Sequence, residues 1–369
     1  MSKKIRIGLV YGGRSGEHDV SLQTALAVMK AIDYSKYEIK PVYITQQGDW
    51  RHGPSGVERL QSKEQLTLGE SADARISAVD PISARALSKT GVTGLSEEHA
   101  VDVVFPLLHG TYGEDGTIQG LLEMAGIPYV GAGVLASAVG MDKVMMKKIF
   151  AHEGLPQCMF RHFTKSHWKQ EQTFHVMEIE VSLGYPCFVK PANLGSSVGI
   201  SKVHNRQELL EAIEYAFRFD RKVIVEESID AREIEVGVLG NDRPITSVPG
   251  EVVSNHEFYD YKAKYIDGNS AMLIPADLEE DVKLKLQEMA IRAFQAIDAA
   301  GLSRVDFFIK RGDGQILINE INTMPGFTPF SMYPLLWRES GKTYPELLNE
   351  LIMLALERHK GKEDIQYTF

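Results

Sequence analysis

The segment that begins at Arg304 constrains the fold of this chain more than any other. Two apolar, β-favouring runs flank a Gly-Asp-Gly turn, a pattern that predicts an antiparallel hairpin. If the loop centres on Asp313, Asp306 lies opposite Glu320 and Arg304 lies opposite Asn322. Because side chains alternate between the two faces of a strand, we expect these four polar side chains on one face of the hairpin.

Opposed carboxylates on neighbouring strands repel each other, so a cation is expected between Asp306 and Glu320. Together with the amide of Asn322 they supply only oxygen ligands, which suit a hard ion such as Mg²⁺ that keeps some water and shares phosphate oxygens. The alternative is a solvated hairpin face with ordinary charges. We predict the metal site, because polar residues interrupt the apolar strands only at matching positions.

The composition narrows the class of protein. A chain of 369 residues is long enough for two or three domains with hydrophobic cores. The net charge of -10 argues against a general binder of nucleic acid or anionic membrane, since both require a basic surface. Cys158 and Cys187 are too few for a disulfide framework and fit a reducing compartment. With no signal-peptide pattern and no apolar run that could span a bilayer, we expect a cytoplasmic protein.

The order of elements in the first third predicts an α/β domain. A strand at 5–11, a glycine loop, a helical pattern and a strand at 38–45 form a unit typical of a parallel sheet. The polar stretch from about 48 to 98 is expected to be a variable excursion of that domain. A strand at 102–108 then resumes the sheet.

The rest of the chain alternates in the same way. A basic helix is expected at 137–153, and the polar stretch 165–177 is expected to be a loop or insertion. The other expected elements are strands at 187–190, 199–203, 222–227 and 233–239, a helix at 206–217 and a closing amphipathic helix at 344–358.

Two glycine loops are candidates for holding anions. The first loop ends where a helix begins, so amide groups and the helix dipole favour an anion, although Glu17 and Ser21 could equally be capping residues. Its glycine spacing does not match the dinucleotide fingerprint. The loop after Lys190 is the stronger candidate for an anion site, because a lysine followed by a Gly/Ser hairpin would place backbone amides and hydroxyl groups over phosphates. It is not a Walker A loop, since the lysine precedes the glycines.

Two further segments gain meaning only in combination. Glu226 ends an apolar strand and Glu233 follows one short turn later, so both could accept hydrogen bonds from a ribose or be solvated edge charges. The stretch 259–265 mixes tyrosines with lysines between two strands, which is typical of a lid that orders over an anionic ligand. The alternative is an ordinary surface loop.

Six segments together resemble the D-alanine–D-alanine ligases of the ATP-grasp superfamily. They occur in that family's order and span essentially the whole chain, which makes the combination specific. The six segments are 12–21, 109–116, 190–199, 259–265, 304–306 and 319–326. Two polar regions, 48–98 and 165–177, look longer than in compact members of the family.

The resemblance implies an α/β protein with the three-domain ATP-grasp architecture. A parallel N-terminal α/β domain would occupy residues 1–134, and two α+β domains, a central one at 135–227 and a C-terminal one at 228–369, would enclose ATP. The lysines of the ATP site would contact phosphates, its serine would lie in the covering loop and its glutamates would bind the adenosine end. The residues assigned in this way are Lys143, Lys190, Ser197, Glu226, Glu233 and Lys264.

The resemblance also implies roles in catalysis. Glu17, Ser196 and Tyr265 would form a hydrogen-bonded trio that joins the first loop, the phosphate loop and the lid near the first substrate. Arg304 and the amide of Gly326 would stabilise an oxyanion.

Substrate and metal contacts are implied as well. Ser331 would receive the carboxylate of the second substrate, and His109 would lie near the substrate. Two Mg²⁺ ions, replaceable by Mn²⁺, would be held by Asp306, Glu320 and Asn322, with Glu320 touching both ions.

The reaction that the resemblance implies joins two D-alanine molecules for peptidoglycan precursor synthesis. ATP would phosphorylate the first D-alanine, and the amine of the second would displace phosphate from the acyl phosphate. We expect a homodimer whose partners are D-alanine and ATP, with no nucleic acid and no membrane.

Several alternatives remain open from the residues. D-Lactate or D-serine could replace the second D-alanine, although Tyr265 favours an amine acceptor over D-lactate. A nucleotide-binding sensor without catalysis should have lost metal ligands or Arg304, and all are present. A dinucleotide-dependent oxidoreductase would explain neither the phosphate loop nor the carboxylate hairpin.

Overall fold

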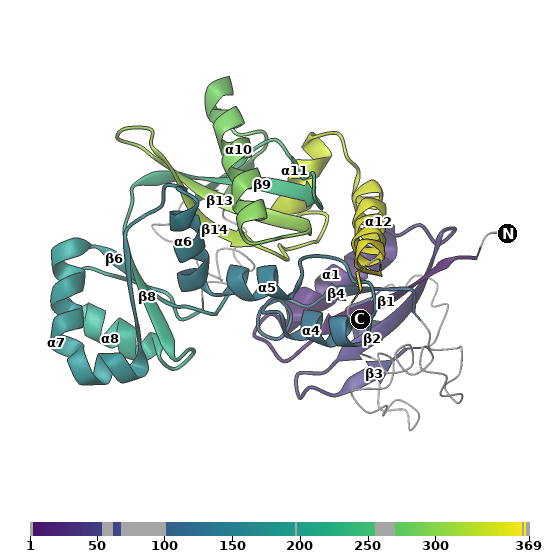
Figure 1. The fold of residues 1–369 in the computed structure, drawn as a ribbon, viewed down its shortest axis with the longest axis horizontal. Helices are drawn as coiled ribbons and strands as arrows, with labels where there is room; N and C mark the ends of the chain where they lie inside the picture. Colours follow the sequence, from purple (N-terminus) through teal and green to yellow (C-terminus); the bar gives the residue numbers. More distant parts are fainter. Residues whose placement is uncertain are drawn as a thin grey trace.

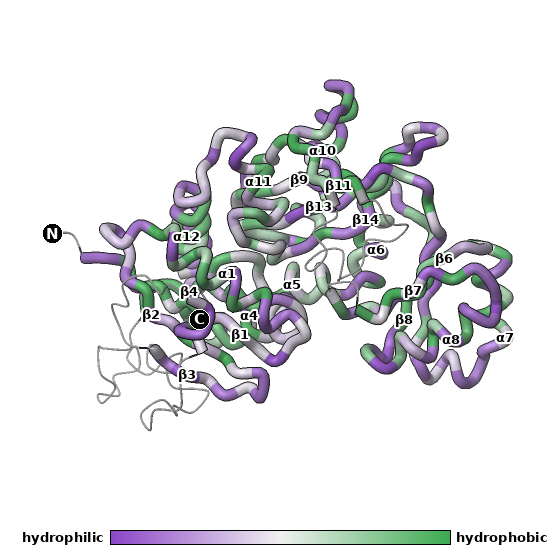
Figure 2. The backbone as a smooth tube through the Cα atoms, turned by 180° about the vertical axis from the view of Figure 1, so that it is seen from behind, coloured by the Kyte–Doolittle hydropathy of each residue, from purple (hydrophilic) through white to green (hydrophobic). Residues whose placement is uncertain are grey.

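The computed structural model describes residues 3–53, 62–67, 101–195, 198–254, 270–363 and 365–366. Within these ranges the chain forms three β-sheets with helices packed against them (Figure 1). The sheet formed within residues 231–322 lies between the other two (Figure 1, Figure 2). No helix in the described ranges combines the length and the apolar character needed to cross a membrane.

The first sheet confirms the predicted parallel α/β unit. Its strand order is β3-β2-β1-β4, with β1 parallel to β2 and β4, and β3 antiparallel to β2. The loop after β1 turns through Gly12 and Gly13, whose positive φ angles glycine adopts without strain. The elements are β1 (Ile5–Gly12), α1 (His18–Ala31), β2 (Tyr37–Ile44), β3 (Trp50–His52), α2 (Lys63–Leu66), β4 (Val103–Leu107) and α4 (Thr117–Met124). Most of the predicted excursion at 48–98 lies outside the described residues.

The second sheet is antiparallel, with the order β5-β8-β6-β7. It confirms the expected hairpin around the Gly/Ser loop and the expected strand that ends in two glutamates. The elements of this part are α5 (Val134–Met141), α6 (Lys143–His152), β5 (Phe160–Thr164), α7 (Lys165–Ser182), β6 (Cys187–Pro191), β7 (Ser201–Val203), α8 (Arg206–Ala216) and β8 (Lys222–Glu227).

The structure corrects two predictions here. The stretch 165–177 is helix α7 and not a loop, because Thr164 caps it and Trp168, Val176 and Ile179 recur at helical spacing on its buried face. The basic helix expected at 137–153 is two helices. Asp142 interrupts them, and its side chain accepts hydrogen bonds from the first backbone amides of α6.

The third sheet is antiparallel in the order β12-β11-β9-β13-β14, with β10 paired to β9. Its hairpin β13–β14 confirms the predicted register: Asp306 is opposite Glu320 and Arg304 is opposite Asn322. The elements are β9 (Ala231–Gly240), β10 (Ile245–Thr246), β11 (Gly250–Ser254), β12 (Ser270–Leu273), α10 (Glu280–Ala296), β13 (Gly301–Lys310), β14 (Ile316–Asn322), α11 (Met332–Glu339) and α12 (Tyr344–Glu363).

The first and third sheets share a hydrophobic core, and helix α6 joins the third sheet to the second. The last helix, α12, buries Leu347, Leu348 and Leu351 against the first sheet, beside β1 and β4 (Figure 1). Helices α5, α6 and α10 pack against the third sheet. The predicted domain boundaries at 134 and 227 stay a prediction, but these contacts hold the sheets around one site.

Candidate active site

A cavity of about 310 Å³ lies where the first sheet, the loop after β6 and the third sheet meet. It gathers predicted site residues that are far apart in the sequence. Those that line it are Glu17, His109, Lys143, Arg304, Glu320, Asn322, Gly326 and Ser331. Further acidic lining comes from Glu114 and Glu235. Among the described lining residues, carboxylates therefore outnumber cations, which favours a ligand that brings positive charge.

A row of three carboxylates crosses the third sheet beside this cavity. Asp306 on β13 is paired with Glu235 on β9 and with Glu320 on β14. Arg304 compensates part of this charge. Its Nε lies 2.7 Å from Asp306 Oδ1 and 2.9 Å from Glu235 Oε2, and its Nη2 lies 2.8 Å from Asp306 Oδ2. Burial works to lower the pKa of Arg304, but Asp306 and Glu235 outweigh it and raise that pKa. The guanidinium is therefore a fixed cation.

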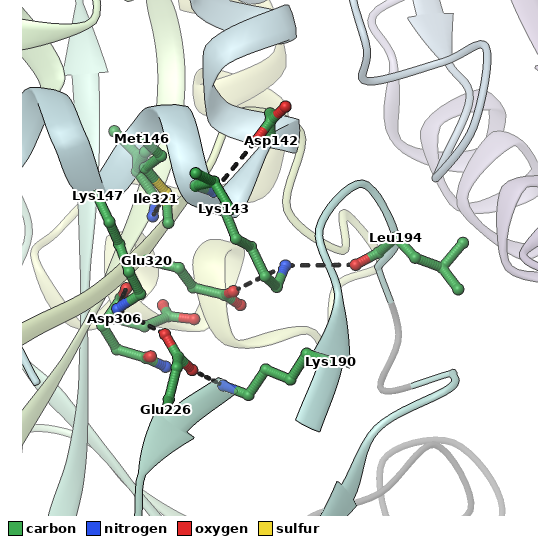
Figure 3. Close-up of polar contacts among 12 residues, drawn as sticks. Asp142, Lys143, Met146, Lys147, Lys190, Leu194, Glu226, Asp306, Glu320 and Ile321 are labelled. Carbon is green, nitrogen blue, oxygen red and sulfur yellow. Dashed lines mark hydrogen bonds and ion pairs between the residues drawn. The ribbon is translucent and has the colours of Figure 1, made fainter. Parts of the chain in front are cut away.

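Lys143 compensates the other end of the row. It is the first residue of α6, and its Nζ lies 3.2 Å from Glu320 Oε2 and donates to the carbonyl of Leu194 at 3.3 Å (Figure 3). The helix thereby connects the β13–β14 hairpin with the glycine loop that follows Lys190. Arg304 and Lys143 therefore each neutralise part of the negative charge of the opposed carboxylates.

The predicted metal ligands form a small, oxygen-only set. Asp306 and Glu320 face each other across the hairpin, and Asn322 lies beside them, where its Oδ1 accepts from the amide of Met324 at 3.2 Å. Two carboxylates and one amide leave several positions for water and phosphate oxygens, as Mg²⁺ prefers. Across the described part of the chain, no group of three or more His, Cys, Asp or Glu side chains is arranged to hold a metal ion.

Glu17 lies where three glycine-containing loops meet. It directly precedes α1 without capping it through its side chain. A Cβ on Gly110 would lie 2.6 Å from Glu17 Oε2, and a Cβ on Gly195 would lie 3.3 Å from it. The carboxylate therefore sits against the backbone of the second glycine loop and close to the phosphate loop. Gly110 has a φ of 75°, so glycine is favoured there for conformation as well as for space.

Burial shifts the pKa values of His109 and Glu114, both from the second glycine loop, toward their uncharged forms. Burial lowers the pKa of His109, whose Nε2 lies 3.2 Å from Thr24 Oγ1. Burial, and then the nearby charge of Glu17, raises the pKa of Glu114 well above its ordinary value. Glu114 accepts a hydrogen bond from the amide of Gly110 at 2.7 Å, which holds the loop in its tight turn.

Glu226 and Lys190 lie beside the cavity but do not line it. Glu226 Oε1 is 2.8 Å from Lys147 Nζ, and its other oxygen forms an ion pair with Lys190 (Figure 3). Burial works to raise the pKa of Glu226, but Lys147 and Lys190 outweigh it and lower that pKa. This carboxylate is therefore ionised, and it is 2% exposed.

The remaining predicted residues fall into two groups. Gly326 and Ser331 lie at the cavity together, and Ser331, which precedes α11, has its Oγ 2.8 Å from Thr328 Oγ1. Glu233 is exposed on β9 and does not line the cavity. The predicted residues that lie outside the described ranges are Ser196, Ser197, Lys264 and Tyr265.

Sequence reasoning missed three charged residues of this region: Lys147, Glu114 and Glu235. Lys147 was counted only as part of a basic helix, although it is 1% exposed. Glu235 alternates with Glu233 along β9, so the strand period predicts that both share one face. The pairing of β9 with β13, which places Glu235 beside Asp306, could not be deduced from the sequence.

Comparisons with known proteins agree with this architecture. The family model described as "D-ala D-ala ligase N-terminus" matches residues 6–132, and "D-ala D-ala ligase C-terminus" matches residues 149–353. A D-alanine–D-alanine ligase of Bacillus cytotoxicus is 56% identical over 365 residues, which is 99% of each chain. One of Listeria innocua is 50% identical over 374 residues, again 99% of each chain.

Solved structures show the same fold. The D-alanine–D-alanine ligase from Coxiella burnetii has a TM-score of 0.78 at 33% identity, covering 98% of this chain and 97% of its own. The VanG D-Ala:D-Ser ligase from Enterococcus faecalis has a TM-score of 0.81 at 36% identity, covering 96% of this chain and 100% of its own. The predicted α/β architecture of the ATP-grasp type is confirmed. This chain belongs to the D-alanine–D-alanine ligase family.

Proposed function

We propose that this chain joins two molecules of D-alanine into D-alanyl-D-alanine, a peptidoglycan precursor, and converts ATP to ADP and phosphate in doing so. Family membership supports the reaction, and the cavity supports it independently. The observation that carries the proposal is the meeting of Glu17, Lys143, Arg304, Glu320 and Ser331 around one space. An acidic cavity with two fixed cations suits substrates that carry both ammonium and carboxylate groups.

The nucleotide would bind with its phosphates toward Lys143 and Lys190, under the loop that carries Ser197 and the lid that carries Lys264. Glu226 and Glu233 would contact the adenosine end. Asp306, Glu320 and Asn322 fit Mg²⁺ by their oxygen-only chemistry and would hold it next to the phosphates, where it would neutralise negative charge during phosphoryl transfer. Glu320 and Lys143 already form an ion pair, so the lysine is placed at the same end of the site.

The first D-alanine would bind near Glu17, whose carboxylate can accept hydrogen bonds from an ammonium group, with Ser196, Tyr265 and His109 close to it. A carboxylate oxygen of this substrate attacks the γ-phosphorus of ATP. The bond from that phosphorus to the β–γ bridging oxygen breaks, ADP leaves and an acyl phosphate forms. Closure of the loops would keep water from hydrolysing it.

The second D-alanine would bind its carboxylate at Ser331, just before α11, where unpaired backbone amides favour an anion. Its uncharged amine attacks the acyl carbon and forms a tetrahedral intermediate. Arg304 and the amide of Gly326 would stabilise the oxyanion, and two carboxylates hold the guanidinium in place beforehand. The carbon–oxygen bond then breaks, phosphate leaves and the amine proton is lost.

The test is ADP production by the purified chain with ATP, Mg²⁺ and D-alanine. L-Alanine, D-alanine with D-lactate, and D-alanine with D-serine serve as comparisons, and products are identified by mass. We expect ADP to appear only with D-alanine and the product to be the D-alanine dipeptide. Phosphate release that does not depend on D-alanine would contradict the proposal and favour a nucleotide-binding protein without ligase activity.

We further propose that the protein acts in the cytoplasm as a homodimer. The two free, buried cysteines support a reducing compartment. Light scattering of the purified chain tests the dimer, and a monomer at micromolar concentration would contradict it.

A further inference from the structure

We propose that Lys147 is a positioning residue of the nucleotide site. It remains paired with Glu226 when nucleotide binds, and this allows Lys190 to leave Glu226 and bind a phosphate group. The proposal rests on the proposed function, because it takes the ligand to be a nucleoside triphosphate. It starts from an ion-pair cluster of three residues, Lys147 on α6, Lys190 on β6 and Glu226 on β8 (Figure 3).

The two lysines of this cluster differ in how firmly they are held. The side chain of Lys147 is 1% exposed, and its Nζ also contacts Asn319 O at 3.4 Å and Cys158 Sγ at 3.5 Å. These contacts tie it to the strand β14 and to the segment before β5. The side chain of Lys190 is 15% exposed. Lys190 is the second-to-last residue of β6, which leads into the Gly/Ser loop. Lys190 is therefore the member that can reorient.

The charge of the cluster points to an anionic ligand. Glu226 is paired with two ammonium groups, those of Lys147 and Lys190, so these three side chains together carry a net charge of one positive unit. Such a charge is costly away from water unless an anion binds to it. Lys143, the third lysine of the region, donates a hydrogen bond to Leu194 O in the loop after Lys190. A phosphate group bound there would remove the imbalance.

Lys147 determines whether Lys190 can be released. When Lys190 turns to a phosphate, Glu226 stays neutralised by Lys147 and no buried carboxylate is left unpaired. Without Lys147, the only cation in contact with Glu226 would be Lys190 among the described residues, and a desolvated carboxylate would hold it strongly. Nucleotide binding would then have to break that pair.

The experiment compares Lys147→Met with Lys148→Met in steady-state kinetics. Lys148 is the neighbouring lysine of α6 and is exposed, so it controls for the loss of one positive charge. We expect Lys147→Met to raise KM for ATP by about tenfold or more, the size of one hydrogen bond to a charged group, and to leave KM for D-alanine unchanged. Lys148→Met should change KM for ATP less than twofold. A Lys147→Met enzyme that loses kcat with KM for ATP unchanged would overturn the proposal, since a merely structural residue has that effect.

A second pair of variants keeps the test decisive even if Lys147→Met does not fold. In a Glu226→Gln background no carboxylate competes for Lys190, so adding Lys147→Met should change KM for ATP less than twofold. A rise in KM for ATP of about tenfold or more when Lys147→Met is added, relative to Glu226→Gln alone, would overturn the proposal. Failure of the ligase assignment itself would look different, because the wild-type chain would then produce no D-alanine-dependent ADP.

Discussion

Replacement of Asp306 by asparagine separates the role of this residue in catalysis from its role in folding. Asp306 accepts two hydrogen bonds from Arg304, at 2.7 and 2.8 Å. Asparagine retains one acceptor oxygen, so one hydrogen bond to a charged group is lost, which costs about 1.5–3 kcal/mol. The substitution also removes repulsion from Glu235 and Glu320, worth about 0.2–1 kcal/mol for each opposed pair. The expected net destabilisation is therefore about 1 kcal/mol and does not exceed about 2.6 kcal/mol.

The expected effect on activity is much larger. If Asp306 is a metal ligand, its loss should lower kcat for ADP formation by about a hundredfold or more, because metal stabilisation of developing charge amounts to several kcal/mol. Urea unfolding and D-alanine-dependent ADP production are measured on the same preparations. Asp313→Asn, an aspartate in the turn of the same hairpin, is the control and should resemble the wild type. Wild-type activity in Asp306→Asn would refute the metal role, and a loss of stability above about 5 kcal/mol would show that the residue is mainly structural.

Three further changes test other parts of the structure. A carboxyl group whose pKa is raised in the folded state costs stability as pH rises from its ordinary pKa toward the raised one. Replacement of Glu114 by glutamine should therefore stabilise the chain at about pH 8 and change its stability little at about pH 4. Equal changes in the free energy of unfolding at both pH values, measured in urea, would contradict a raised pKa for this buried carboxyl group. Leu351→Ala should lower the free energy of unfolding by about 2–5 kcal/mol, because Leu351 is fully buried where α12 meets the first sheet. Met353→Ala, on the exposed side of α12, is the control and should lower it much less. Similar losses for the two variants would contradict this packing of α12. Tyr265→Phe, in the predicted lid outside the described residues, should weaken use of an amine acceptor or relax acceptor choice, and unchanged kinetics with D-alanine and D-lactate would count against that role.

The sequence predicted the β13–β14 hairpin because local rules determine it. Turn residues, alternation and matching polar positions together require Asp306 to face Glu320. The structure reaches this pairing through a register shift, since Phe307 pairs with Ile318 and leaves Asn319 as an extra residue in β14. The symmetric count from Asp313 therefore holds at the polar end of the hairpin and not beside the turn. The carbonyl of that extra residue contacts Lys147.

What the sequence could not predict depends on contacts between distant segments. Helix α7 has a wide polar face, so its sequence resembles that of a loop. Its helical character depends on the tertiary packing of Trp168 and Ile179 in the core of the second sheet. The burial of Lys147 requires α6 to lie against both the second and the third sheet, and no local pattern distinguishes such a lysine from a solvated one. Glu235 became part of the site only through the pairing of β9 with β13.

The most direct test of the account is the position of divalent cations in a crystal grown with ADP and Mn²⁺, located by the anomalous scattering of manganese. We predict manganese bound by Asp306, Glu320 and Asn322 and in contact with phosphate oxygens of the nucleotide, with Arg304 still paired to Glu235. Manganese bound elsewhere, with Asp306 still engaged by Arg304 and Glu320 by Lys143 while ADP is present, would contradict it.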